Sequence, residues 1–411
     1  MDPTADTRPA VLMLLTRDPY VERSGRAAML RQRIEQVSQA YRPVIVVIGR
    51  GEAGPLARLP MAGPVSLALN AVRLAGRPLQ SWLCYTAAVR RQVAQLAAKE
   101  QVVAVYVDML RLAPLAEGLP KAIPRILDYD DLLSTRYRLA AEARAGGYQV
   151  MGFMSGKAPL LSRAANLFSR TLLGAEGRRC EAEELRLLAS ADLALFTSAR
   201  EAQTLAARGA GLPRTPPVLG APPVVRPAAA AKDAAPGERI LFLGNLRYGE
   251  NELMLDDLAR AAQALASQGA WPGGTIIDVV GDHAPEFARR YDPARFRFLG
   301  RVEDLTTLAG AGVFVAPVAS GSGVKLKVLD GMSLGCPVVT TPKGCEGLQA
   351  RADRDLLVCA DATGVLRTAL ALRGKPRLKA MLAARGRAYL ERWHSDAMTE
   401  TLLAAIAKVL A

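Results

Sequence analysis

The sequence predicts an α/β fold with two Rossmann-like domains, each built around a doubly wound parallel sheet. Its 411 residues exceed what one compact core usually holds. Short apolar runs alternate with amphipathic stretches in two separate series, which is typical of βαβ units. We therefore expect an N-terminal domain over residues 1–211, a linker over 212–237, a C-terminal domain over 238–390 and a final helix over 391–411 that packs back on the N-terminal domain.

The first series consists of short, bounded apolar runs of the kind that form strands buried on both faces. The expected strands cover residues 11–15, 44–48, 102–107, 125–129 and 193–196. Between them, residues 26–41 and 87–99 show the 3.6-residue periodicity of amphipathic helices.

A proline-rich stretch from Gly211 to Gly237 ends this series, because its seven prolines fit neither a helix interior nor a central strand. The second series follows, with strands expected over residues 239–244, 275–281, 296–300, 313–318 and 337–341, and helices rich in Ala, Leu and Arg at the end. Open parallel sheets bind ligands beyond the carboxyl ends of their strands, so we expect the two domains to face a central cleft.

The composition favours a negatively charged partner, because the formal net charge is +14. Nucleic acid is disfavoured, since aromatic residues make up only 5% and no basic stretch alternates with them. A phosphorylated small molecule or an anionic lipid surface fits better.

The cysteines and the N-terminus favour a cytoplasmic protein. The five cysteines show no CxxC or His pairing, which predicts reduced thiols and no zinc or other metal site. Residues 1–10 are acidic and polar, unlike a signal peptide, and the longest uncharged stretch, residues 305–324, is too rich in glycine for a membrane span.

Residues 313–348 carry the candidate anion site. A strand ending at Val318 is followed by Gly321, Ser322 and Gly323, a turn whose backbone N–H groups can converge on an anion. A helix expected to start near Gly323 would direct its positive dipole end to the same place. Lys325 and Lys327 in its first turns oppose that dipole unless an anion is bound, and such local conflicts are expected at functional sites.

Asp330 lies seven residues after Gly323, about two helical turns along the same helix. A carboxylate there can accept paired hydrogen bonds from a ribose diol, as in dinucleotide sites. The alternative is an ordinary turn followed by a solvated Lys/Asp helix face, which the short glycine motif alone does not exclude.

The whole segment resembles glycosyltransferase family 4, the group 1 glycosyl transferases, and is similar to bacterial sugar transferases of exopolysaccharide systems. The family pattern G-x-x-x-K-x-L-E-A-M-A-x-G-x-P-V-V-x-T-x-x-G-x-E-G-[IL], or a close variant of it, is matched here by Lys327, Leu329, Asp330, Met332, Gly335, Pro337, Val338, Val339, Thr341, Gly344, Glu346, Gly347 and Leu348. Further family segments are resembled by five stretches of the chain, residues 126–137, 244–251, 279–282, 298–305 and 392–402. The resemblance implies a GT-B type fold.

The resemblance also implies site residues. Asp330 takes the place of a ribose-binding glutamate. The diphosphate is held where Gly244, Arg247, Lys325 and Lys327 lie. Glu346 faces the donor sugar or steadies its loop. The donor-binding set predicted here comprises Ser24, Gly25, Arg26, Gly244, Asn245, Arg247, Gly321, Ser322, Gly323, Val324, Lys325, Lys327 and Asp330; the catalytic set comprises Asp128, Asp131, Lys327 and Glu346.

The chain departs from the family pattern at two places. Ser322 stands where many members have a glutamate, and the N-domain histidine of many relatives is absent, since His283 and His394 are the only histidines. The acidic cluster Asp128, Asp130 and Asp131 could orient or deprotonate an acceptor hydroxyl, or could merely cap the following helix. Asp108 is a second candidate for that role.

Ser24, Gly25 and Arg26 form a short loop after the first expected strand, where acceptor and donor phosphate meet in this fold. Arg26 could neutralise the leaving diphosphate, but helix capping by Ser24 explains the residues equally well.

A basic stretch from Glu142 to Glu176 could bind a membrane surface. It contains no acidic residue between its ends but includes Lys157, Arg163 and Arg170, with Leu161, Phe168 and Leu172 at helical spacing. Such a helix can lie on anionic lipid, and members of the family that the chain resembles commonly act on polyprenyl-linked acceptors at the inner membrane face. The alternative is a helix that faces the other domain and whose apolar stripe is simply core.

Together these observations predict transfer of a sugar from a nucleoside-diphosphate donor to a hydroxyl of a glycan or lipid-linked acceptor in polysaccharide biosynthesis. The resemblance implies retention of the anomeric configuration and no obligatory metal. The alternatives are a non-catalytic nucleotide-sugar-binding or membrane-scaffold protein, and an epimerase or phosphorylase on the same scaffold.

Overall fold

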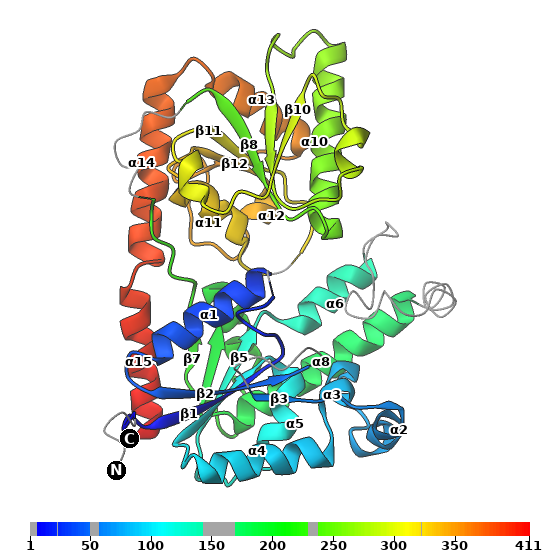
Figure 1. Ribbon diagram of the computed structural model, residues 1–411, viewed down its shortest axis with the longest axis vertical. Helices are drawn as coiled ribbons and strands as arrows, with labels where there is room; N and C mark the ends of the chain where they lie inside the picture. The colour runs from blue at the N-terminus through cyan, green and yellow to red at the C-terminus, as the bar shows by residue number, and fades with distance from the viewer. Residues whose placement is uncertain (1–5, 23, 50–56, 143–168, 229–236, 322) are drawn as a thin grey trace. The chain divides into compact units, whose positions relative to one another are not determined.

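The computed structural model describes residues 6–22, 24–49, 57–142, 169–228, 237–321 and 323–411. The chain divides into two compact units. Unit 1 comprises Met1–Pro223 and Met398–Ala411, and unit 2 comprises Val224–Ala397. The division falls inside the stretch expected as a linker, and the last helix belongs to unit 1 (Figure 1).

Unit 1 contains a parallel sheet in the order β3-β2-β1-β4-β5-β6-β7. Its strands are β1 (Ala10–Leu15), β2 (Arg42–Ile48), β3 (Ala57–Leu59), β4 (Ala104–Asp108), β5 (Arg125–Asp130), β6 (Leu193–Phe196) and β7 (Val218–Gly220). All five expected strands are present, and short strands at the two edges complete the sheet. β7 lies within the proline-rich stretch, which an edge strand tolerates because one side of its backbone needs no partner.

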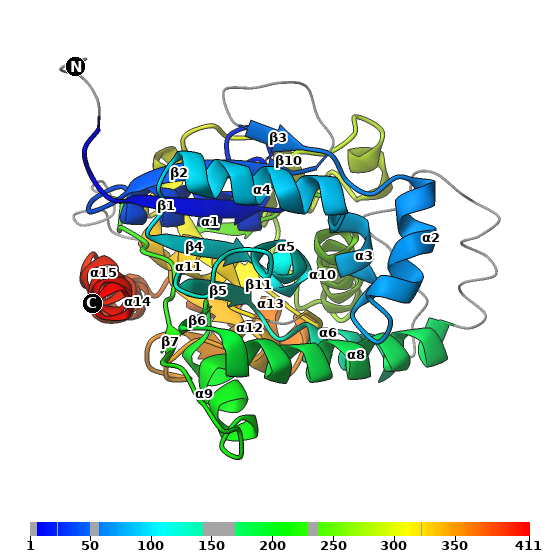
Figure 2. The ribbon, with the colours of Figure 1, turned by 90° about the horizontal axis from the view of Figure 1, so that it is seen from below.

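The helices of unit 1 cover both faces of this sheet, as Figure 2 shows for α1 and α4. They are α1 (Gly25–Val37), α2 (Pro64–Arg73), α3 (Leu79–Cys84), α4 (Ala87–Lys99), α5 (Ala113–Ala116), α6 (Leu133–Glu142), α8 (Ser169–Ser190), α9 (Ala199–Arg208) and α15 (Ala397–Leu410), with a 3-10 turn η1 (Leu110–Leu112).

Alternate residues of β1 enter two different cores. Leu12 and Leu14 join one cluster with residues of α4, α6, α8 and α9, whereas Val11 and Met13 join another with residues of α1 and α15. This alternation explains why the strands read as continuous apolar runs, since successive side chains point to opposite, equally buried faces.

Unit 2 contains a second parallel sheet in the order β10-β9-β8-β11-β12-β13. Its strands are β8 (Arg239–Leu243), β9 (Ile277–Val280), β10 (Phe296–Gly300), β11 (Gly312–Ala316), β12 (Val338–Thr340) and β13 (Leu357–Val358). Its helices are α10 (Gly249–Ser267), α11 (Leu326–Ser333), α12 (Pro342–Cys345), α13 (Ala362–Leu372) and α14 (Pro376–Trp393), with 3-10 turns η3 (Phe287–Arg290) and η4 (Leu305–Leu308). Both sheets reverse their order beside their first strand, which is the switch point where such folds bind ligands.

Candidate functional site

The candidate donor site lies in unit 2, in the loops after β8 and β9. Gly244 N donates a hydrogen bond to Val280 O at 2.9 Å. Gly281 has a φ of +149°, and a Cβ added there would lie 1.9 Å from Gly244 O. The two loops therefore touch through their backbones, and only glycine fits at position 281.

The turn after β11 lies at the same edge of the sheet, because the carboxyl ends of parallel strands lie together. Gly321 and Gly323 have φ values of +99° and +69°, which favour glycine. Ser322 lies outside the described residues. Helix α11 starts at Leu326, three residues later than expected, and Lys325 takes the N-cap position, with its ammonium group donating to Gly323 O at 3.0 Å.

The Lys327 side chain connects the loop after β11 to the loop after β8. Its Nζ donates to Asn251 Oδ1 at 2.5 Å and lies 5.5 Å from the centre of the Phe242 ring. Asn251 Nδ2 in turn donates to Asn245 O at 2.8 Å. Burial lowers the pKa of Lys327 to about 8, against the opposing effects of Glu250 and Asp330.

Asp330 lies one turn after Lys327 on α11, so both side chains lie on the same side of the helix. Burial raises the pKa of Asp330 to about 6, although the nearby Lys327 lowers it. The structure thus brings together the ammonium and carboxylate groups that the sequence predicted as a donor site.

The other predicted residues of unit 2 differ in their surroundings. Arg247 is exposed and its Nε donates to Asp282 Oδ2 at 2.7 Å. Glu346 follows β12 and forms an ion pair with Lys343, while Val324 packs against the unit 2 core.

Neither histidine lies among these donor-site contacts. His283 stands edge-on to Phe298, with ring centres 5.2 Å apart, and its Nδ1 lies 2.9 Å from Ala284 O. His394 is buried, and its Nε2 lies 3.2 Å from the Tyr389 hydroxyl.

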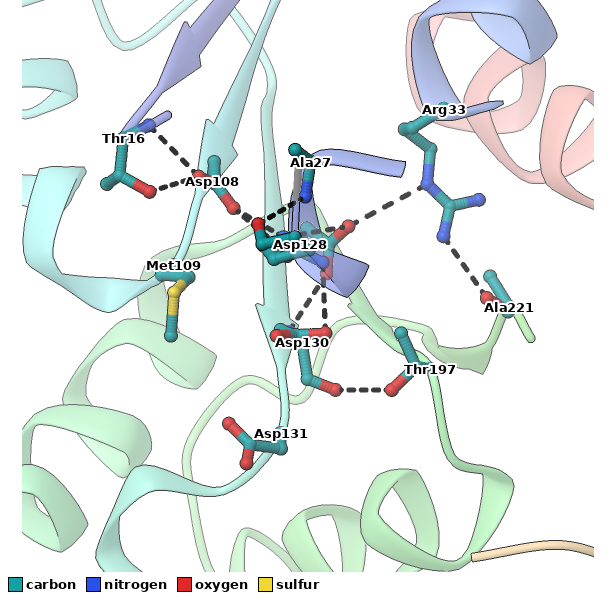
Figure 3. Close-up of polar contacts among 12 residues, drawn as sticks. Thr16, Ala27, Arg33, Asp108, Met109, Asp128, Asp130, Asp131, Thr197 and Ala221 are labelled. Carbon is teal, nitrogen blue, oxygen red and sulfur yellow. Dashed lines mark hydrogen bonds and ion pairs between the residues drawn. The ribbon is translucent and has the colours of Figure 1, made fainter. Parts of the chain in front are cut away.

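Unit 1 has its own group of candidate residues, a buried charge cluster at the carboxyl ends of β4 and β5 (Figure 3). Asp108 is fully buried and accepts hydrogen bonds from Thr16 N at 3.0 Å and Thr16 Oγ1 at 2.6 Å. Arg26 Nε donates to its other oxygen at 3.0 Å. Burial raises the pKa of Asp108, but Arg26 and Thr16 outweigh this effect, so the pKa is lowered.

Arg26 also faces the two acidic residues of β5. Its Nη2 lies 3.5 Å from Asp128 Oδ2, and its Nη1 lies 3.0 Å from Asp130 Oδ1. Burial would lower the pKa of this guanidinium, but the three carboxylates reverse the effect and raise it well above its usual value. The sequence suggested that Arg26 meets a diphosphate; the structure places it as the shared counter-ion of three aspartates.

Asp128 is held by a further arginine and a tyrosine. Arg33 Nε lies 3.7 Å from Asp128 Oδ2, and the Tyr106 hydroxyl donates to the same oxygen. Arg33 also donates to Ala221 O at 3.1 Å and to Gln36 Oε1 at 2.9 Å. The carboxylate of Asp128 is therefore enclosed by partners within unit 1.

Asp130 is the one carboxylate on Arg26 with substantial exposure, at 21% of its side chain. Its φ is +63°, and the pairing of β5 with β6 shifts register here. Burial raises its pKa to about 6, against the effect of Arg26. Asp131 points away from this cluster and forms an ion pair with Arg136 on α6.

The loop before α1 has the capping geometry that was the alternative interpretation. Ser24 is the N-cap, and its side chain accepts a hydrogen bond from Ala27 N at 3.2 Å. Gly25 is the first helical residue and Arg26 the second, which directs the Arg26 side chain to the strand ends.

Sequence reasoning missed the residues that hold these groups in place. Arg33 follows Arg26 by seven residues, a spacing that puts both on one helix face and could have indicated a shared target. Asn251 ends the 244–251 motif, but nothing local indicates that it accepts from a lysine 76 residues later. Tyr106 reads as an ordinary strand residue.

The basic stretch between Glu142 and Glu176 falls largely on residues 143–168, outside the described residues. Its proposed helix with Lys157, Arg163 and Phe168 is therefore not described here. None of the helices in the described parts of the chain combines the length and apolarity that crossing a membrane requires.

Comparisons with known proteins bear on the C-terminal domain and on the fold. Residues 237–372 match the family model "Glycosyl transferases group 1". This match confirms the prediction of a glycosyltransferase domain in the C-terminal half, which is the basis for classing the protein as an enzyme. A comparison with curated proteins finds no match.

Solved structures resemble the chain over nearly its whole length. Sucrose-phosphate synthase from Thermosynechococcus elongatus is 15% identical, with 98% of this chain and 99% of that chain covered and a TM-score of 0.61. HepE from Anabaena, in complex with UDP and glucose, is 13% identical over 98% and 100%, with a TM-score of 0.59. α,α-Trehalose 6-phosphate synthase from Burkholderia multivorans is 13% identical over 98% of both chains, with a TM-score of 0.59. These similarities confirm the predicted GT-B type fold.

Proposed function

We propose that this protein is a family 4 glycosyltransferase that moves a sugar from a nucleoside-diphosphate sugar to a hydroxyl of a glycan or lipid-linked acceptor. The observation that carries the proposal is a pair of ammonium groups within the residues that match the group 1 family model. Lys327 Nζ is held by Asn251 of the loop after β8, and Lys325 Nζ donates to Gly323 O in the glycine turn. A cation placed among backbone N–H groups is suited to a diphosphate.

In this proposal the protein acts mainly by positioning and by stabilising charge on the departing diphosphate. Lys327 supplies the charge, Lys325 and the glycine turn add further donors, and Asp330 binds the ribose diol. Glu346 contacts the donor sugar or its loop. We propose retention of the anomeric configuration and no metal requirement, so a chelator should leave the rate unchanged.

Unit 1 is proposed to bind the acceptor, with Asp128 and Asp131 as the candidate carboxylates. The ion pairs of Asp128 with Arg26 and Arg33 favour a supporting role for it. Replacement by Asn would then reduce stability and acceptor binding together, whereas a direct proton acceptor would lose turnover with acceptor binding intact.

We propose polysaccharide biosynthesis as the setting, with the protein cytoplasmic and peripheral on the inner face of the plasma membrane. The net charge of +14 supports attraction to anionic lipid. The basic stretch from 142 to 176 supports the same surface on sequence grounds.

The donor is tested first with UDP, because the HepE structure holds UDP and glucose. A thermal-shift screen of UDP, GDP and their sugars should show one nucleotide that raises the melting point, since a ligand specific for the folded state stabilises it. K327M and D330A should abolish this shift with little change in ligand-free melting.

K375M is the matched control, because Lys375 is an exposed lysine at the start of α14. An unchanged shift in both K327M and D330A would move the donor site elsewhere. Donor binding without transfer to a broad acceptor panel would favour the non-catalytic alternative, and isomerised donor without acceptor would favour an epimerase.

A further inference from the structure

Helix α2 of unit 1 exposes apolar side chains and buries a polar one, the reverse of an ordinary surface helix. Its one buried residue is Asn70, whose Nδ2 donates to Trp82 O and Tyr85 O, both at 2.8 Å. The apolar side chains of Val65, Leu69 and Val72 are instead exposed, at 76%, 48% and 80%. Surface helices normally bury their apolar stripe and expose their polar face.

The exposed residues form one continuous stripe. Positions 65, 69 and 72 follow the i, i+4, i+7 spacing of a single helix face, and Asn70 lies on the opposite face. The two hydrogen bonds from Asn70 hold α2 against α3 in this orientation. Because the helix is held with its apolar stripe outward, the stripe is available to an apolar partner.

The charge around the stripe points to an anionic partner. Helix α2 itself carries one basic residue and no acidic one. Arg73, the last residue of α2, is exposed beside Val72. An apolar stripe flanked by arginine is the composition of helices that lie in the interface of an anionic membrane, where the arginine reaches the headgroups.

The size of the stripe disfavours a second copy of the chain. A ten-residue helix is about 15 Å long, so one face offers far less than the roughly 800 Å² per partner of a stable protein interface. Two chains of net charge +14 would also repel each other. Insertion among lipid headgroups needs only a few apolar side chains.

Neighbouring elements extend this side of unit 1. α3 bonds to α8, where Leu79 N donates to Glu176 Oε1 at 2.6 Å, and to α6 through Gln80 and Tyr137. In both views α2 lies on the same side of unit 1 as the C-terminal end of α6 and the N-terminal end of α8 (Figures 1 and 2). The partly exposed Leu139 and Leu172 belong to these two helices.

We propose that the α2 stripe, Val65, Leu69 and Val72, is a docking surface for an anionic lipid bilayer. The proposal rests on the peripheral membrane association proposed above and assigns it to a surface. It does not depend on sugar transfer, because α2 contains none of the residues proposed to bind donor or acceptor.

The test is sedimentation of the full-length protein with phosphatidylcholine vesicles and with vesicles of equal phosphatidylcholine and phosphatidylglycerol, at low salt. The wild type should sediment with the anionic vesicles, and L69Q/V72Q should lower its partition coefficient at least tenfold. R73Q should lower it about fivefold, because one arginine near such a surface contributes about a factor of this size.

L378Q/M381Q is the matched control, since these two exposed apolar residues lie on α14 of unit 2. It should sediment like the wild type. Circular dichroism and the nucleotide thermal shift establish that each variant is folded, and V65Q replaces the double variant should that variant fail to fold.

Three outcomes would overturn the assignment. If L69Q/V72Q and the wild type sediment equally with the anionic vesicles, the protein binds lipid through a surface other than α2. Failure of the wild type to sediment would refute membrane association as a whole, while the thermal-shift test of donor binding would stand separately. If L69Q/V72Q differs from the wild type in oligomeric state by sedimentation velocity, while its vesicle binding is unchanged, the stripe is a contact between copies of the chain.

Discussion

Replacing Arg26 by Met should destabilise unit 1 far more than the loss of an ordinary ion pair. Arg26 is the shared counter-ion of Asp108, Asp128 and Asp130, and the first two are almost completely buried. Removing one partner of a buried pair leaves an uncompensated charge and costs about 3–5 kcal/mol. For a unit of this size, that loss lowers the melting temperature by roughly 10 °C.

The effect should depend on pH. In the wild type the pKa of Asp108 is lowered, so its contribution to stability is present above the unfolded pKa and is lost as the pH falls through the folded value. In R26M, burial acts without Arg26 and raises the folded pKa of Asp108 above its unfolded value, so stability falls as the pH rises through the unfolded pKa. The difference between variant and wild type should therefore be largest at pH 7 and shrink toward pH 4.

Calorimetry of the full chain measures this difference, with R247M as the matched control. Arg247 forms an exposed pair with Asp282, and exposed pairs contribute about 0–1 kcal/mol. D108N in the R26M background should restore part of the lost stability by removing one unpaired charge. A melting temperature of R26M no lower than that of R247M would refute the reasoning.

Three further expectations concern the two units separately. Nucleoside diphosphate affinity should fall as the pH rises through about 8, where Lys327 of the free protein loses its charge, and K327R should flatten this profile in a calorimetric titration. The folded pKa of Asp130, about 6, lies above its unfolded value, so the folded protein binds more protons and loses stability as the pH rises from about 4 to 6. D130N should reduce this loss, which urea unfolding at several pH values measures. G281A should abolish nucleotide binding or unfold unit 2, since its Cβ would overlap Gly244 O. G269A, also at a positive φ but with no atom within 4 Å of the added Cβ, should cost only about 1 kcal/mol in thermal melting.

The strands of the two sheets could be predicted because their residues are buried on both faces. Residues 11–15 and 193–196 are uninterrupted apolar runs, and each lies inside a strand of the structure. The edge strands β3, β7 and β13 contain only two or three residues each. Segments this short show no periodicity, so the sequence does not predict them. The predicted helix near Gly323 starts later because the two positive-φ glycines cannot belong to a right-handed helix.

The candidate site could be predicted by residue type but not by pairing. Lys327 and Asp330 follow a recognisable pattern, and the structure places both on one side of α11. The partners that define their environment, such as Asn251, come from distant segments that only the folded chain brings together. The positive φ of Asp130 likewise has no sequence signal, since it depends on the register shift between β5 and β6.

Helix α15 has a consequence for how this protein is made. Leu402 and Ile406 complete the apolar layer over β1 and α1, and Gln36 Nε2 donates to Thr399 Oγ1 at 2.9 Å. Unit 2, by contrast, is built from one uninterrupted stretch of chain. During synthesis unit 2 can therefore finish folding while unit 1, although translated first, still exposes the apolar surface that α15 covers. A ribosome that stops after Ala397 would release a polypeptide with that surface uncovered, which makes the nascent first half a natural client for chaperones.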